Sequence, residues 1–165
     1  MAVLPVLVYP DERLKRISAR VTEFNDDLQR LIADMEETLR SFPGCVGLAA
    51  PQVNHFQRIA IVDVSAKPGV RHHGRLLLVN PEVVAEAGEV VGREGCLSVP
   101  DYTGNVARAE RIQLRAQAAN GEPRHYECEG YEARAVQHEI DHLDGLLFLE
   151  RLVSRRDIFR RKVYK

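Results

Sequence analysis

Two stretches of the chain place apolar residues at three- and four-residue intervals, the spacing that buries one face of a helix. The first is "FNDDLQRLIADMEETLRSFPG", in which Asn25 or Asp26 can accept hydrogen bonds as the N-terminal cap. Pro43 and Gly44 interrupt the pattern at its other end. The pattern therefore predicts a long N-terminal helix that ends before Pro43.

The second stretch covers residues 131 to about 143, and Gly145 is placed to end it. A further, C-terminal helix is predicted to begin at Ser154, because Asp157 stands three positions on, as in a capping box. The pattern thus predicts three helices.

Between the first two helices the pattern changes to β-branched runs and two-residue alternation, which predict strands. The runs are "RIAIVDVS", "RLLLVNPEVVAEAG" and "RIQLRAQAANGEPRHYECEG", and Asn120-Gly121 in the last is a strong hairpin signal. The N-terminal run "AVLPVLVYP" predicts an early strand. We expect an α+β fold in which antiparallel sheets pack around the central 131–143 helix, with N-terminal and C-terminal helices beside them.

Composition narrows the classes of function. The 165 residues fit one domain, 1–165, and the hydrophobic (45%) and charged (28%) fractions are ordinary for a soluble globular protein. A formal charge of -1 gives no overall attraction to nucleic acid or to a membrane. Three cysteines do not suggest a disulfide framework, and the N-terminal apolar run contains two prolines and no preceding basic residue. We therefore expect a cytoplasmic protein with free thiols.

The central helix contains "HEIDH", in which two histidines stand four positions apart. On a helix His138 and His142 lie one above the other, so both imidazoles can bind one ion. Glu139 flanks that ion without binding it, where a carboxylate can handle protons. Such motifs also occur by chance on surface helices. The test is a third ligand, because a catalytic site normally has three protein ligands and one position for water.

The third ligand is expected upstream of the helix. Phe148 stands where one peptidase class has a histidine, and no glutamate follows Glu150. Upstream, "REGCLSVPDY" places Cys96 after a glycine, and a thiolate is a strong ligand for a borderline divalent ion. A free cysteine is more often a buried structural residue, and Cys45 and Cys128 are rivals for the role.

Three motifs together give the chain a specific resemblance. "CVGLAAPQ" (45–52), "EGCLSVP" (94–100) and "QHEIDHLDG" (137–145) are similar, in the same order, to three motifs of the peptide deformylase family of bacteria and organelles. Members of that family are metal amidases that remove the formyl group from the N-terminal formyl-methionine of new proteins. The resemblance covers the chain from about residue 3 to residue 163 and agrees with the expected α+β plan.

The resemblance implies that Cys96, His138 and His142 bind one divalent ion. Fe2+ is the ion expected in cells, and Zn2+, Ni2+ and Co2+ are alternatives that the ligand set does not separate. The resemblance also implies that Glu139 is the acid and base of a hydrolysis that releases formate.

Gln52 and the backbone N–H of Leu97 are implied to bind the developing oxyanion, where one donor is typically worth about 2.7 to 4 kcal/mol. The "GLAA" stretch has no bulk, so a substrate backbone can lie against it as an added strand. A slot for the methionine side chain maps to Val46, Tyr131, Arg134 and Ala135, and Gly47 and Gly95 are further substrate-binding residues. In this slot the Arg134 methylenes are expected to pack while its guanidinium reaches solvent.

The implied partners are N-formyl-methionyl nascent peptides, with no membrane contact, and the chain is expected to be a monomer. The tail "SRRDIFRRKVYK" has six basic residues and one acid, and we hypothesise that its helix makes a transient contact with the ribosome. Two rival functions stay open: a zinc endopeptidase that cleaves internal bonds, and a binding module whose metal is enclosed by a fourth protein ligand.

Several further residues carry expectations of their own. Cys45 replaces a glycine that usually opens the first family motif, and it is predicted to be tolerated and not to bind the metal. Glu94 and Arg108 are predicted to pair behind the Cys96 loop, and Asp141 either orients a ligand imidazole or faces water. Four histidines are predicted to be solvated, with weak metal binding by the adjacent pair: His55, His72, His73 and His125.

Overall fold

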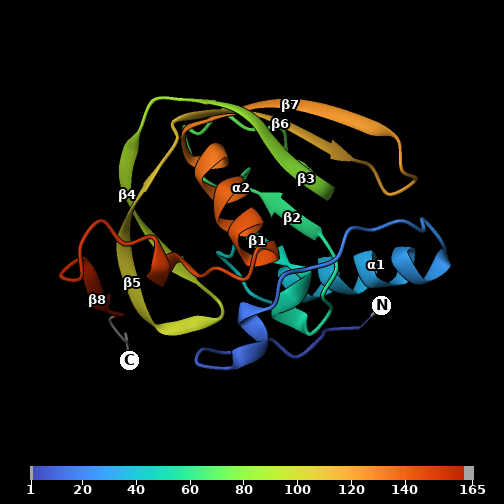
Figure 1. Cartoon of the computed structure of the whole chain (residues 1–165), viewed down its shortest axis with the longest axis horizontal. Coiled ribbons are helices and arrows are strands. Elements are labelled where there is room, and N and C mark those ends of the chain that lie inside the picture. Colours follow the sequence, from blue (N-terminus) through green and yellow to red (C-terminus); the bar gives the residue numbers. More distant parts are fainter. Residues whose placement is uncertain (1, 162–165) are drawn as a thin grey trace.

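The computed structural model describes residues 2–161, and within this range the chain forms two α-helices and eight strands (Figure 1). The helices are α1 (Asp26–Arg40) and α2 (Gly130–Leu143), and three short 3-10 helices are η1 (Glu12–Lys15), η2 (Ala50–Val53) and η3 (Phe148–Glu150). The strands are β1 (Gly47–Ala49), β2 (Ile59–Asp63), β3 (Arg75–Ala87), β4 (Val90–Cys96), β5 (Val99–Arg108), β6 (Arg111–Gln117), β7 (Pro123–Glu129) and β8 (Ile158–Arg160). In residues 2–161 no helix is long and apolar enough to cross a bilayer.

Helix α1 confirms the first predicted helix. The Asn25 side chain caps it by accepting a hydrogen bond from the Leu28 N–H at 3.0 Å. Its buried face packs on one of the hydrophobic clusters and consists of Leu28, Leu31, Ile32 and Met35. The helix ends at Arg40, before Pro43 and Gly44.

Five strands form an antiparallel sheet in the order β1-β2-β3-β6-β7. The predicted hairpin is present: β6 and β7 are joined through residues 118–122, where Gly121 adopts a φ of 89°. Ala118 donates to the Glu122 carbonyl at 2.8 Å, which closes the turn. Strand β1 lies at one edge of this sheet and β7 at the other.

The second sheet has the order β4-β5-β8, and residues 90–108, which supply its first two strands, were not predicted to be strands. Charged Glu94 and Arg108 occupy buried positions there and obscure the two-residue alternation that marks a strand. The register shifts between Glu94, which pairs with Gly104, and Cys96, which pairs with Val99, so the extra residues of the irregularity lie on β5.

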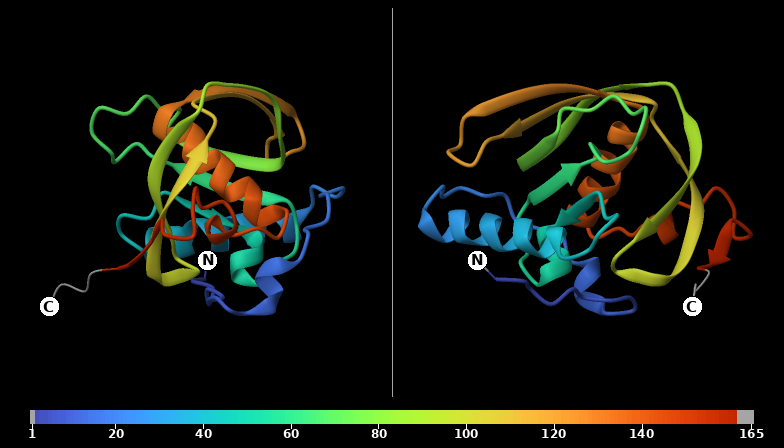
Figure 2. Two further views of the ribbon diagram at one scale, coloured as in Figure 1. Left: turned by 60° about the vertical axis from the view of Figure 1, so that its left-hand side comes forward. Right: turned by 180° about the vertical axis from the view of Figure 1, so that it is seen from behind.

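Helix α2 lies at the centre of the molecule, as predicted. The five-stranded sheet curves over it, and the β4–β5 hairpin passes along its side (Figures 1 and 2). Its inner face packs against β2, β3 and β6 through a cluster of buried apolar residues that includes Leu78, Leu114 and Val136. Gly145 adopts a φ of 77° just after the helix, and a side chain there would collide with the Lys15 carbonyl.

Two predicted elements are absent from the described residues. Residues 2–8 form no strand: the Leu7 and Tyr9 N–H groups instead donate to the carbonyls of Gln52 and Ser98, both at 2.7 Å. Pro5 and Pro10 have no backbone N–H group, so they cannot donate the hydrogen bonds that pair one strand with the next. The N-terminal segment therefore supports two loops of the site described below.

The predicted C-terminal helix is also wrong. Residues 154–157 form a turn and 158–160 form β8, while 162–165 lie outside the described residues. Asp157 bonds to Asn105 of β5 through both its backbone carbonyl (2.9 Å) and its carboxylate (3.0 Å). These contacts hold the segment against the second sheet, so tertiary bonding overrides the local helix signal.

Candidate metal centre

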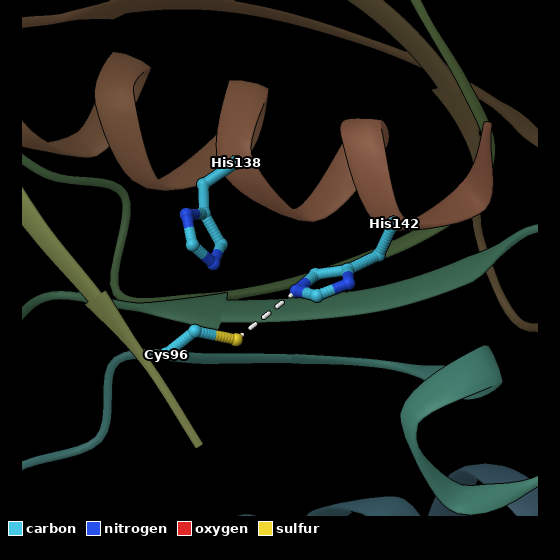
Figure 3. Close-up of side chains that lie close together, drawn as sticks. All are labelled: Cys96, His138 and His142. Carbon is cyan, nitrogen blue, oxygen red and sulfur yellow. Dashed lines mark hydrogen bonds between the residues drawn. The ribbon is translucent and has the colours of Figure 1, made fainter. Parts of the chain in front are cut away.

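Three donor side chains from two distant parts of the chain meet in the interior. Cys96 ends β4, and His138 and His142 project from successive turns of α2 (Figure 3). Cys96 Sγ lies 3.2 Å from His142 Nε2, and the ligand atoms of all three residues lie within 4.8 Å of one another. Two donors on one tetrahedral zinc are about 3.3–3.6 Å apart, given bond lengths of about 2.0–2.3 Å. The set therefore fits a single divalent ion.

The two imidazoles differ in their surroundings. Burial and the neighbouring His138 hold the pKa of His142 well below its ordinary value, so its ring is neutral and can offer a lone pair. Burial alone would lower the pKa of His138, but the hydrogen bonds that its ring donates to Cys96 and Glu94 outweigh burial and raise that pKa. His138 Nδ1 lies 2.8 Å from Glu94 Oε1, which leaves its other nitrogen for a cation.

Glu139 is buried beside these donors. Burial raises the pKa of its carboxyl to about 7, and its Oε1 has no hydrogen-bond partner among the described residues. Gly47 of β1 packs directly against it: a Cβ added at Gly47 would lie 2.5 Å from Glu139 Oε2. A buried carboxyl with an unpaired oxygen and a pKa near neutrality can accept and release a proton.

The amide of Gln52 is held in one orientation. Its Oε1 accepts from the Ala49 N–H at 2.9 Å, so its Nε2 faces Ser98 Oγ at 3.1 Å and Cys96 Sγ at 3.5 Å. Leu97 follows Cys96 in the turn between β4 and β5 and is half-buried. Both amide donors thus lie next to the thiol of the three-donor set.

A network of buried charges lies behind the donors. Arg108 bonds to both oxygens of Glu94 at 2.9 Å and to Asp141 Oδ2 at 2.6 Å, which confirms the Glu94–Arg108 pair. Asp141 contacts arginines and neither imidazole, so the carboxylate that orients His138 is Glu94. The sequence contains one indication that Glu94 lies near the metal donors. Glu94 and Cys96 are two residues apart, and side chains at that spacing on a strand lie on the same face.

The residues predicted to bind the substrate border one cavity of about 610 Å3. All six line it, together with Cys96, His138 and Glu139: Val46, Gly47, Gly95, Tyr131, Arg134 and Ala135. The expectation for Arg134 is wrong in one respect. Its guanidinium turns inward and bonds to Glu94 at 2.6 Å and to the carbonyls of Val90 and Val106.

Further cavity residues were missed by the sequence reasoning. Arg93, Pro100 and Arg161 line the cavity from the second sheet, and a side chain on Gly95 would lie within 2.6 Å of the Arg161 guanidinium. No local motif marks them, because β8 brings Arg161 to the site only through its pairing with β5.

Cys45 also lines the cavity, but it is not one of the three grouped donors. Its thiol donates to the Gly47 carbonyl at 3.2 Å, and burial raises the pKa of Cys45 to about 11, so it stays protonated near neutral pH. All four histidines expected to be solvated are exposed: His55, His72, His73 and His125. The His73 ring also bonds to the buried Glu132, a contact that was not predicted.

Comparison with known proteins agrees with this geometry. Residues 3–157 match the family model described as polypeptide deformylase. The peptide deformylase of Alkalilimnicola ehrlichii is 47% identical over 166 residues, which cover 100% of this chain and 91% of that protein. A crystal structure of a peptide deformylase from Legionella pneumophila has a TM-score of 0.86 at 40% identity, covering 94% of this chain and 88% of the other.

A class I type b peptide deformylase from Acinetobacter baumannii, in a crystal structure with Met-Ala-Ser bound, also has a TM-score of 0.86, at 37% identity. It covers 92% of this chain and 99% of that one. The family-model match covers β1 to β7 and α2, including the three motifs that meet at the metal centre. The chain therefore belongs to the polypeptide deformylase family, whose members are metal-dependent hydrolases that act on N-formyl-methionine peptides.

Proposed function

We propose that Cys96, His138 and His142 hold the catalytic ion and that Glu139, Gln52 and the Leu97 N–H carry out deformylation around it. The observation that carries the proposal is the convergence of three buried donors beside Glu139 in a cavity of about 610 Å3. A bound divalent ion supplies Lewis-acid polarisation and lowers the pKa of water toward about 7. The set has three protein donors within residues 2–161, which argues against a closed structural site.

Glu139 is proposed to move the proton. As a water oxygen adds to the formyl carbon, the Glu139 carboxylate takes the water proton, and it then gives that proton to the departing amine as the C–N bond breaks. The products are formate and a peptide with a free amino terminus. Burial of Glu139 and the unpaired Oε1 support this role, because the carboxyl changes protonation state readily near neutral pH.

Gln52 and Leu97 are proposed to donate to the formyl oxygen as charge builds on it. The Gln52 amide is neutral, and its bond from Ala49 fixes the nitrogen toward the site, so no reorganisation is required during the reaction. The Leu97 N–H belongs to the turn immediately after the Cys96 donor.

The substrate peptide is proposed to extend the five-stranded sheet. Strand β1 is at the edge of that sheet, and its first residue, Gly47, lines the cavity. An extended peptide can pair with this edge while its methionine side chain enters the slot lined by Val46, Tyr131 and Ala135. The Arg134 methylenes can pack there, while its guanidinium stays in the buried network.

The remaining assignments are also proposals. We propose Fe2+ as the ion in cells, with Zn2+, Ni2+ and Co2+ as alternatives, and a monomer of one catalytic domain, residues 1–165. Three cysteines without disulfides support a cytoplasmic location. Ribosome contact by the basic tail stays a proposal, although its described part is a turn and strand rather than a helix.

The decisive experiment compares three substrates with the iron-loaded protein kept free of oxygen. We expect hydrolysis of formyl-Met-Ala-Ser with release of formate, and no cleavage of acetyl-Met-Ala-Ser or of internal bonds in an unformylated peptide. Cleavage of the internal bonds would support an endopeptidase instead. Stoichiometric metal with no turnover of any substrate would support a binding module.

Replacement of Cys96 is expected to remove the bound ion. Cys96→Ser takes away a thiolate ligand, so the purified variant should lose about one equivalent of metal per chain. Cys45→Ser is the matched control and should keep its metal, because Cys45 is not in the donor set. Elemental analysis of both variants checks this, and the reverse pattern would reassign the third ligand.

Gly47→Ala is expected to lower kcat/KM about 10- to 100-fold with the metal retained. The added methyl would lie 2.5 Å from Glu139 Oε2, so the carboxylate must move, and a displacement of about 1 Å can cost on the order of 100-fold in rate. Steady-state kinetics with formyl-Met-Ala-Ser, with metal content measured alongside, test the prediction. An unchanged kcat/KM would mean that the position of Glu139 is not critical.

A further inference from the structure

A second group of donor side chains lies outside the catalytic cavity. His73 from the β2–β3 connection, Cys128 from β7 and Glu132 from the first turn of α2 place one ligand atom each within 4.8 Å of one another. They border a separate cavity of about 660 Å3 that is also lined by β3 and β6. Deformylation as proposed above uses none of the three.

The burial of Glu132 needs an explanation. It is 1% exposed, and an isolated carboxylate in such a place costs several kcal/mol unless it is compensated. Among residues 2–161 its salt-bridge partner is His73, which is neutral unless protonated. The arginine nearest in sequence to that histidine, Arg71, pairs with Glu129 instead at 2.9 Å. The His73 backbone N–H, which donates to Glu132, offsets part of the burial cost, and a bound cation would balance the remaining charge.

The three side chains are already held in place. Glu132 accepts from the His73 backbone N–H at 2.7 Å and contacts His73 Nδ1 at 2.5 Å. Tyr126, two residues before Cys128 on β7, packs edge-on against the His73 ring with centroids 5.5 Å apart. The four-residue step from Cys128 to Glu132 crosses the junction of β7 and α2, so the strand and the helix fix both donors relative to each other.

The donor types define the class of ligand. One imidazole nitrogen, one cysteine sulfur and one carboxylate are ligands that zinc and similar borderline divalent ions take together, and they disfavour Mg2+ and Ca2+. Burial and the neighbouring Glu132 raise the pKa of Cys128 to about 12, so its thiol would lose the proton only as a cation binds. The cavity lining adds more negative than positive groups: Glu86, Glu127 and Glu129 against Arg71 and Arg111. Because His73 is 39% exposed, an ion can enter from solvent and keep a water ligand.

We propose that His73, Cys128 and Glu132 form a second binding site for a zinc-like divalent cation, separate from the catalytic centre. Binding requires the His73–Glu132 contact of 2.5 Å to open toward the separation of about 3.3 Å that two donors on one ion adopt. A small rotation of the exposed histidine suffices for this. The site would join the β2–β3 connection to β7 and α2 by a metal cross-link.

The first test counts zinc in the full-length protein, dialysed against zinc at one buffered free concentration. We expect two equivalents per chain in the parent and in His72→Ala, the matched control at the neighbouring exposed histidine, and one in His73→Ala. Affinity at the second site should fall more than about 100-fold in His73→Ala, beyond the loss for changing an outer-shell partner. One equivalent in the parent, or equal zinc in both variants, would overturn the proposal.

The second test uses Co2+ in a Cys96→Ser background, so that the catalytic thiolate does not contribute. We expect a thiolate-to-cobalt charge-transfer absorption that survives Cys45→Ser and disappears in Cys128→Ser. An absorption that persists in Cys128→Ser, or that never forms, would mean that His73 and Glu132 are only an ion pair. Neither test measures enzymatic activity. A negative result for the second metal site would therefore not bear on the proposed deformylase function.

Discussion

Glu139→Gln is expected to lower kcat for formyl-Met-Ala-Ser by about 10²- to 10⁴-fold, the usual contribution of a positioned acid or base. Glutamine keeps the size of the side chain but cannot take a proton from water or return one to the amine. Because Glu139 is not one of the three grouped donors, the variant should bind its metal as the parent does.

The fold of this variant should be intact. Replacing a buried carboxyl by a neutral amide removes a desolvation cost, so the thermal midpoint should not fall. Glu150→Gln, at an exposed position just after the central helix, is the control and should retain full activity. If Glu139→Gln kept parental kcat with normal metal content, another group would have to carry the proton.

The pH dependence offers an independent check on Glu139. Burial raises the pKa of this carboxyl from 4.5 to about 7, and a cation bound beside it would lower the pKa again. A general base must be unprotonated, so kcat/KM should fall as the pH falls through that pKa, between 4.5 and about 7. This acid limb should be absent from the residual activity of Glu139→Gln.

Sequence patterns predicted those site residues that lie close together along the chain. His138 and His142 are one helical turn apart, so their meeting follows from helix geometry alone. Cys96 lies 46 residues before His142, and only the three-motif resemblance singled it out from the other two cysteines. Its approach to α2 depends on the β4–β5 hairpin, whose strands were not recognised.

The failures have a common cause in long-range contacts. The early strand is replaced by bonds to the loops that carry Gln52 and Ser98, and the C-terminal helix by bonds between Asp157 and Asn105. The bond between His73 and Glu132 was not predicted, because the two residues are 59 positions apart in the sequence. The spacing of apolar residues predicts which face of a helix or strand is buried. It does not predict which polar groups from distant parts of the chain form hydrogen bonds with that element.

Arg108→Met is expected to lower the free energy of unfolding by about 3–5 kcal/mol, the cost of removing one partner from a buried ion pair. Arg108 is 6% exposed and joins β5 to Glu94 of β4 and Asp141 of α2. Methionine fills most of the volume but leaves two buried carboxylates with fewer donors. Arg134 and Arg151 still contact them and should limit the loss.

Chemical denaturation of the metal-loaded variants measures this, with Arg115→Met as the matched control. Arg115 also pairs with a glutamate, Glu82, but both side chains are more than half exposed, so its replacement should change stability by less than about 1 kcal/mol. Equal losses in the two variants would contradict a stabilising role for the buried network.

The loss should also depend on pH in a defined direction. Burial disfavours the charged form of Glu94, but hydrogen bonds from His138 and Arg108 outweigh it and hold the pKa of Glu94 well below 4.5. A carboxyl whose pKa is lowered by folding stabilises the fold above its unfolded pKa, and that contribution disappears as the pH falls toward the folded pKa. The difference between the parent and Arg108→Met should therefore be largest near neutral pH and narrow below 4.5. A difference that widened in acid would show that Glu94 is not the carboxylate that Arg108 keeps ionised.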